Sequence, residues 1–254
     1  MRNKVLNIAK NLSERIKRWE GVECVTLGEA AEIEIYDPYF IIDLDVLYRG
    51  SILPTNDRRK NFGEISGFES SLVYQVDNFL IEDLPVRVNY QETTRIELIL
   101  ERIENGKWSY REGSTNIFYR IQHGEVIYSR GDWLERIKKR VEAIPEDFWR
   151  VIMESARCQL SRILSDLGAS AYRKDTLFFT ISAADFLKVF LSFIFADNRT
   201  FEPSGRMLLQ RVMSLPRLPD GFEGRLESFL RYDGTFDLEK KREIAELLFR
   251  SILS

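Results

Sequence analysis

Two aspartates, Asp43 and Asp45, stand two residues apart inside an otherwise apolar run that ends at Tyr48. In an extended strand, residues two apart project from the same face, about 7 Å apart along the backbone. Their carboxylates can therefore converge on one hard cation such as Mg²⁺, which prefers oxygen ligands and usually arrives with substrate phosphates. A metal held in this way neutralises the charge that develops during phosphoryl-type transfer.

A solvated strand face is the competing interpretation, because an Asp-x-Asp pair alone is a weak signal. Asp is disfavoured in strands, however, and this pair lies in the middle of an apolar run. The opposite face of the same strand is apolar throughout, with Phe40, Ile42, Leu44, Val46 and Tyr48. The pattern favours a functional carboxylate pair on one face and a core on the other.

Cysteine and histidine offer little further chemistry, since the chain has two cysteines and one histidine. Cys24 lies in a strand-like run and Cys158 in a helix-like one, so we expect both to be core thiols. The single histidine, His123, cannot build a histidine-based metal site or a Ser-His-Asp triad by itself. We expect it to be structural or on the surface.

Composition limits the class of protein. The 254 residues carry a formal net charge of -3, with 44% hydrophobic and 30% charged residues, which is typical of one or two globular domains. This balance demands neither nucleic acid nor an anionic membrane as a partner. The most apolar stretch, 176–196, contains Asp185 and Lys188 and is better explained as a buried helix than as a membrane span. Without a signal-peptide pattern, we expect a cytoplasmic protein.

The part of the chain that contains the two aspartates is predicted to be rich in strands, and the part that follows is predicted to be helical. In the first part, hydrophobic periodicity predicts helices at 3–20, 68–80 and 95–103, strands at 22–27, 40–48 and 86–90, and turns with short strands over 108–128. In the second part it predicts helices at 134–142, 146–168, 178–197, 204–214, 222–231 and 238–253. We therefore predict an α+β fold, with a mixed sheet and flanking helices in a domain of residues 1–135 and a helical bundle in residues 136–254.

The order of these elements resembles the nucleotidyltransferase superfamily, and within it the aminoglycoside (kanamycin) nucleotidyltransferases. Tyr36-Asp-Pro-Tyr-Phe-Ile-Ile-Asp-Leu-Asp45 is similar to the metal-binding strand of that family and the approach to it. Leu84-Pro-Val-Arg-Val-Asn-Tyr90 is similar to the strand that carries a third acid. Residues 178–204 and 218–224 resemble the C-terminal helices of the aminoglycoside enzymes.

The resemblance implies roles for particular residues. Asp43 and Asp45 would bind Mg²⁺, and Gly28 would shape the loop that holds the triphosphate of ATP. On the helical domain, Asp166 would be the general base, with Glu154 as a fallback. Arg173 and Lys174 would contact phosphates.

Two positions depart from the family pattern. Glu29 follows Gly28, where the family has a small residue that lets phosphate approach. Arg87 stands at the position of the third acid, where it could pair with Asp43 or Asp45 in competition with a metal, or hold a substrate phosphate.

The function that the resemblance implies is Mg²⁺-dependent transfer of a nucleotidyl group, AMP from ATP, to a hydroxyl of a small molecule. Its partners would be that acceptor and a nucleoside triphosphate, with no nucleic acid and no membrane. The resemblance also implies a homodimer. The alternative is a degenerate, non-catalytic member of the fold that binds a nucleotide or a protein partner.

Overall fold

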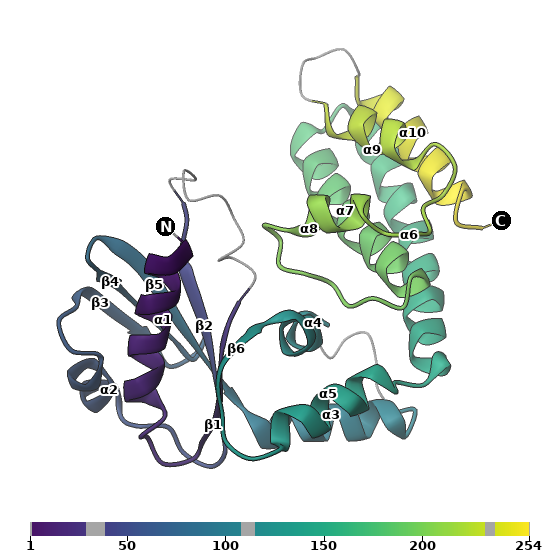
Figure 1. The fold of residues 1–254 in the computed structure, drawn as a ribbon. Helices are drawn as coiled ribbons and strands as arrows, with labels where there is room; N and C mark the ends of the chain where they lie inside the picture. Colours follow the sequence, from purple (N-terminus) through teal and green to yellow (C-terminus); the bar gives the residue numbers. More distant parts are fainter. Residues whose placement is uncertain (1, 29–38, 108–114, 232–236, 254) are drawn as a thin grey trace. The chain divides into compact units, whose positions relative to one another are not determined.

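The chain forms two compact units in the computed structural model, which describes residues 2–28, 39–107, 115–231 and 237–253. Within these ranges, the residues up to 145 form the sheet unit and the residues from 146 onward form the helical unit. The division predicted after residue 135 falls inside helix α5 (Trp133–Glu142), which belongs to the sheet unit. The predicted α+β fold, with a mixed sheet followed by helices, is confirmed (Figure 1).

A mixed sheet with the strand order β3-β4-β5-β2-β1-β6 organises the first unit. Its strands are β1 (Val22–Leu27), β2 (Ile42–Tyr48), β3 (Ser66–Ser71), β4 (Val76–Ile81), β5 (Leu84–Glu92) and β6 (Glu125–Ser129). Strands β2 and β5 pair in parallel, whereas the other pairs of neighbours are antiparallel. The three predicted strands thus lie side by side in the middle of the sheet, with β2 flanked by β5 and β1.

Helix α1 (Arg2–Ile16) covers one face of this sheet (Figure 1). Its apolar residues recur every three or four positions and are buried, namely Val5, Ile8, Ala9, Leu12 and Ile16. They pack against Ile42, Leu44, Val46, Val86 and Val88 from the central strands. Gly21 then reverses the chain with a φ of 79°, and a Cβ at this position would lie 2.3 Å from the main-chain oxygen of Arg49. The alternation predicted for β2 is confirmed, since its even-numbered residues face α1.

Two short segments of the sheet unit differ from the prediction. The helix expected at 68–80 is the β3–β4 hairpin, and the turns and strands expected over 108–128 include helix α4 (Asn116–His123). Two further helices, α3 (Thr93–Glu104) and α5, follow β5 and β6 in the chain and contact β5 and β1 respectively. His123 ends α4, and its ring contacts that of Tyr119 in a tilted arrangement with 4.3 Å between the ring centroids.

A buried ion pair anchors helix α2 (Thr55–Phe62) to strand β4. Arg58 donates from Nε and Nη2 to the two carboxylate oxygens of Asp77 at 2.7 and 2.9 Å, and from Nη1 to the main-chain oxygen of Leu53 at 2.7 Å. Nη2 also reaches Ser70 Oγ at 3.0 Å, and the Tyr90 hydroxyl donates to Asp77 at 2.6 Å. Burial, reinforced by Asp77, raises the pKa of Tyr90 above its usual value. With these hydrogen bonds, every nitrogen of the Arg58 guanidinium has an acceptor.

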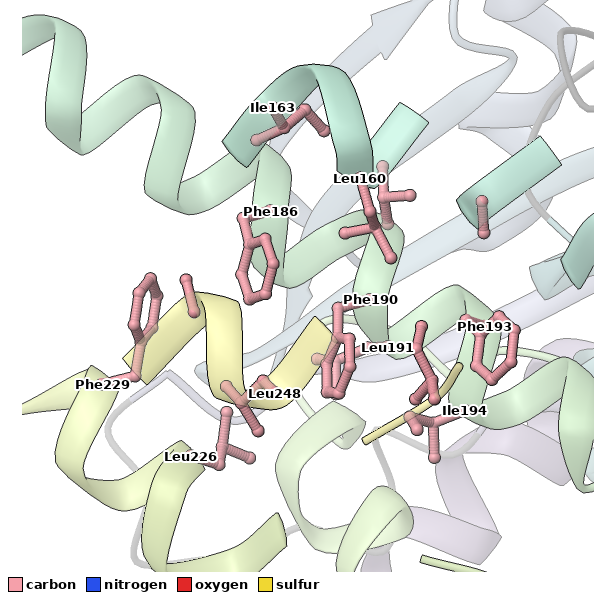
Figure 2. Packing of buried hydrophobic residues seen from close by; sticks show 14 of the residues in the cluster. Leu160, Ile163, Phe186, Phe190, Leu191, Phe193, Ile194, Leu226, Phe229 and Leu248 are labelled. Atoms are coloured by element: carbon pink, nitrogen blue, oxygen red, sulfur yellow. The ribbon is translucent and has the colours of Figure 1, made fainter. Parts of the chain in front are cut away.

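The second unit is a bundle of α6 (Glu146–Arg173), α7 (Thr176–Asp197), α8 (Leu208–Met213), α9 (Phe222–Leu230) and α10 (Leu238–Arg250). Figure 2 shows its core, in which Phe186 and Phe190 of α7 pack with side chains of α6, α9 and α10. Among the described helices, α7 is long and apolar enough to cross a membrane, and half of its most apolar window is buried. Within the bundle, α7 supplies the largest share of the buried aromatic residues.

The two cysteines differ in environment. Cys24 is buried in β1, as predicted, and burial raises the pKa of its thiol to about 12. Cys158 is exposed on α6, so the expectation that both thiols lie in the core is wrong for this residue. Its neighbours Ala156 and Leu160 occupy the core face of the helix, which leaves position 158 on the outside.

Replacing Asp77 tests the energetic weight of the buried pair. We expect Asp77→Asn to lower the free energy of unfolding by about 3–5 kcal/mol, because it leaves the buried Arg58 charge unpaired. Urea denaturation followed by circular dichroism measures the loss. Asp83→Asn is the matched control, since Asp83 is an exposed turn residue with φ 63°, a conformation that Asn tolerates. A loss below about 1 kcal/mol in Asp77→Asn would contradict this account.

Candidate metal and nucleotide site

Asp43 and Asp45 lie on the face of β2 opposite α1, as their strand phase predicted. Their residues are only 5% and 3% exposed, so both carboxylates are nearly removed from water. The flanking strands exclude solvent from both sides, with Thr26 of β1 opposite Asp45 and Arg87 of β5 opposite Asp43. The interpretation as a solvated strand face is therefore excluded, and two buried negative charges need positive partners.

Arg120 of helix α4 supplies that partner. Its Nη1 lies 2.8 Å from Asp43 Oδ2, and its Nε donates to Asp45 Oδ2 at 2.6 Å. Burial, which lowers the pKa of Arg120, is outweighed by the two aspartates, so that this pKa lies above its usual value. One guanidinium thus bridges the two carboxylates at the place where the sequence predicted a cation.

The trio is not electrically neutral. Two carboxylates and one guanidinium leave a net charge of -1 if both acids are ionised. Burial is the main cause that raises the pKa of Asp45, to about 6, and the neighbouring Asp43 adds to it while Arg120 opposes it. One arginine therefore compensates two buried acids only in part.

The neighbouring strand β5 contributes an amide rather than a third acid. Asn89 donates from Nδ2 to Asp43 Oδ1 at 2.8 Å and to the main-chain oxygen of Leu44 at 3.1 Å. The parallel register places Asn89 beside Asp45 and Arg87 beside Asp43. Asn89 thereby orients the Asp43 carboxylate without adding charge.

Of the two alternatives for Arg87, pairing with the aspartates is not what the structure shows, and the role as a phosphate ligand stays a prediction. Arg87 Nε donates to Asn78 Oδ1 on β4 at 3.4 Å, on the side of β5 away from β2. It shares the sheet face of Asp43, but Arg120 takes the position at the carboxylates. Arg120 was missed because it lies 75 residues from Asp45 in a segment expected to lack a helix.

Gly28 closes the site from the end of β1, where its N–H donates to the main-chain oxygen of Asp43 at 2.7 Å. A Cβ at this position would lie 3.0 Å from Arg120 Nη2 and 3.3 Å from Asp43 Oδ2. A larger residue at position 28 would therefore press against the guanidinium and the carboxylate. Glu29, the next predicted site residue, lies outside the described residues.

The donor set suits a divalent cation once Arg120 has left it. Hard carboxylate oxygens in a buried setting are ligands that Mg²⁺ accepts. Among the described residues, however, three or more His, Cys, Asp or Glu side chains do not gather at any one point. With Arg120 in place, the two Oδ2 atoms are already engaged.

The remaining predicted site residues belong to the helical unit. Asp166 is half-buried on α6, and Glu154 is exposed, with its Oε1 3.8 Å from Arg150 Nη1. Arg173 and Lys174 are exposed at the end of the same helix, where Lys174 adopts a φ of 55°. Their roles as general base and phosphate ligands stay predictions.

The pH dependence of stability tests the environment of Asp45. Because the pKa of Asp45 rises from 3.8 in the unfolded chain to about 6 in the fold, the native state keeps this proton longer. Unfolding then releases a proton between these pH values, so the contribution of Asp45 to stability falls as pH rises from 4 to 6. We expect a fall of up to about 3 kcal/mol.

The measurement is the difference between the free energies of unfolding of wild type and Asp45→Asn. Both are determined by urea denaturation in buffers that contain EDTA. Asparagine does not titrate, so the difference removes the contributions of other carboxylates, several of which act in the opposite direction. A difference that stays flat or rises between pH 4 and 6 would contradict the burial of Asp45.

Comparisons with known proteins give two similarities. Residues 111–206 match the family model described as "Domain of unknown function (DUF4037)", a range that includes Arg120 and Asp166 and begins after the two aspartates. No curated protein matches the chain in sequence. Among solved structures, the chain is similar to a nucleotidyltransferase-like protein from Exiguobacterium sibiricum 255-15, with 14% identity and a TM-score of 0.47, over 98% of this chain and 74% of that chain.

Proposed function

We propose that the chain is a nucleotidyltransferase-like protein that transfers a nucleotidyl group from a Mg²⁺-bound nucleoside triphosphate to a hydroxyl of a small molecule. One observation carries the proposal: two nearly buried carboxylates on one strand face converge on a single cationic group, with contacts of 2.6 and 2.8 Å. Burying two acids side by side is costly. An ion pair that served stability alone would require only one of the two acids.

Asp43 and Asp45 would hold the metal, and Asn89 would keep the Asp43 carboxylate in its orientation through the hydrogen bond to Oδ1. When bound, Mg²⁺ supplies neutralisation of the charge on the triphosphate. Gly28 would let phosphate approach only once Arg120 has moved, because a Cβ there would lie 3.0 Å from Arg120 Nη2 and 3.3 Å from Asp43 Oδ2. The contribution of this chain is then mostly positioning and electrostatics.

The acceptor hydroxyl needs a base, and for this role we propose Asp166 of the helical unit. Arg173 and Lys174 would contact phosphates from the same helix. ATP is the proposed nucleotide, and a small hydroxyl compound is the proposed acceptor. A cytoplasmic location and a homodimer remain part of this proposal.

A second function is favoured by a specific observation. Arg120 occupies the carboxylates, and β5 offers Asn89 and Arg87 where a third acid would complete a metal site. A protein that keeps this arrangement with ligand bound would bind a nucleotide without transferring any part of it. Turnover separates the two functions.

The test measures pyrophosphate release from ATP and Mg²⁺ in the presence of a protein-free fraction of small cellular metabolites. We expect turnover by wild type, and a loss of at least about 100-fold in Asp45→Asn, because losing a metal ligand removes several kcal/mol of charge stabilisation. Asp132→Asn is the matched control, since Asp132 is an exposed acid of the same unit whose side chain is 74% accessible. Mg²⁺-independent release, or equal rates in both variants, would contradict transfer at this site.

A further inference from the structure

The sheet unit contains two buried arginine–carboxylate sites, and they differ in how completely their groups are satisfied. At the first, Arg58 meets one acid, Asp77, and all of its guanidinium nitrogens find acceptors. At the second, Arg120 meets two acids and one of its nitrogens, Nη2, is buried without a hydrogen-bond partner among the described residues. The first site is complete as it stands, whereas the second lacks one positive charge and one acceptor.

The two sites also differ in how accessible their side chains are to solvent, and the site of Arg120 is again the less enclosed one. The side chains of Arg58 and Asp77 are 4% and 0% accessible, so neither can leave without opening the core. The side chain of Arg120 is 15% accessible, against 7% and 5% for those of Asp43 and Asp45. Arg120 is therefore the most accessible member of its trio.

The helix that carries Arg120 is itself fixed. Phe118, Tyr119 and Ile121 on either side of it are buried, which holds the backbone of α4 against the rest of the unit. A change at this site is then a change of side-chain rotamer, on the scale of a few ångströms, rather than a movement of the helix.

From these contrasts we propose that Arg120 is a displaceable counter-ion. In the ligand-free protein it partly compensates the charges of Asp43 and Asp45. When a triphosphate arrives, its guanidinium pairs with phosphate oxygens and the two carboxylates pass to a divalent cation. This inference rests on the metal and triphosphate site of the proposed function, and it adds that nucleotide and metal bind cooperatively through one side chain.

The exchange satisfies both deficits of the free site. The phosphate supplies the acceptor that Nη2 lacks, and arginine binds phosphate in bidentate fashion. The carboxylates exchange a single positive charge for a double one, so their net charge rises from -1 to 0. Neither half of this exchange is favourable alone. If Arg120 moved to a phosphate without a cation, two carboxylates would be left without a counter-ion, and a cation that arrived without phosphate would be repelled by the guanidinium.

Mn²⁺ binding, measured by the loss of the electron paramagnetic resonance signal of free Mn²⁺, tests the proposal without requiring turnover. We expect weak binding to wild type alone and at least tenfold tighter binding with α,β-methylene-ATP, whose α–β link is not cleaved. The signal from Asp45→Asn with the same nucleotide sets the baseline for Mn²⁺ held by the nucleotide itself. Arg120→Met should bind Mn²⁺ at least tenfold more tightly than wild type without any nucleotide.

Arg136→Met is the matched control, because Arg136 is an arginine of α5 whose side chain is 61% accessible and pairs with Asp132. It should bind Mn²⁺ as wild type does. If Arg120→Met is unstable without metal, its thermal unfolding should shift upward by several degrees with Mn²⁺, a shift that wild type does not show. A variant that fails to fold under both conditions leaves the nucleotide dependence of wild type to decide.

Two results would overturn the proposal: Mn²⁺ binding by wild type that nucleotide does not strengthen, or a folded Arg120→Met with no gain in Mn²⁺ affinity. Failure of the proposed function has a different signature. In that case Mn²⁺ binding follows the pattern expected here, while pyrophosphate release from ATP is absent.

Discussion

Two carboxylates buried side by side on β2 are the constraint on which the site depends. Asp43 and Asp45 cannot be hydrated at this position, so the unit must bring a cation and hydrogen-bond donors to them. Arg120 reaches them from a helix that follows much later in the chain, and Asn89 from the strand paired in parallel with β2. The packing of α4 near the sheet is thus tied to charge compensation as well as to apolar burial.

The same unit shows two uses of a buried arginine. Arg58, with one acid and a full set of acceptors, fastens α2 to the hairpin and to Tyr90. Arg120 meets two acids, and its Nη2 has no hydrogen-bond partner within the part of the chain that the structure describes, so its site is balanced only in part. Replacing either arginine would leave buried acid behind, but at Asp43 and Asp45 another cation could restore the balance. In the proposed function, ligand binding would therefore affect stability at the site of Arg120 and not at the site of Arg58.

Local pattern predicted the strand phase of the aspartates, because alternation depends on adjacent residues of one strand. The central strands and α1 were also predicted from patterns within one element, alternation for the strands and three- and four-residue spacing for the helix. Arg120 was out of reach, since its contact joins β2 to a helix of only eight residues, too short for its periodicity to stand out beside Gly124. The β3–β4 hairpin was mistaken for a helix because Phe68, Leu72, Val76 and Phe79 recur every three or four positions, as on an apolar helix face. Arg87 was placed on the correct face, yet strand phase does not decide which arginine reaches the acids.

Charge also limits the order in which ligands can occupy this site. With Arg120 in place, the trio carries a net charge of -1 in a setting where water screens poorly, so a triphosphate that arrives without a cation meets repulsion. A divalent ion alone would have to displace a guanidinium that keeps two short contacts. The metal–nucleotide complex avoids both costs, because its phosphates attract the arginine while its metal compensates the acids. Under the proposed function, a buried site built from two acids and one arginine would therefore favour a ligand that carries both charges together.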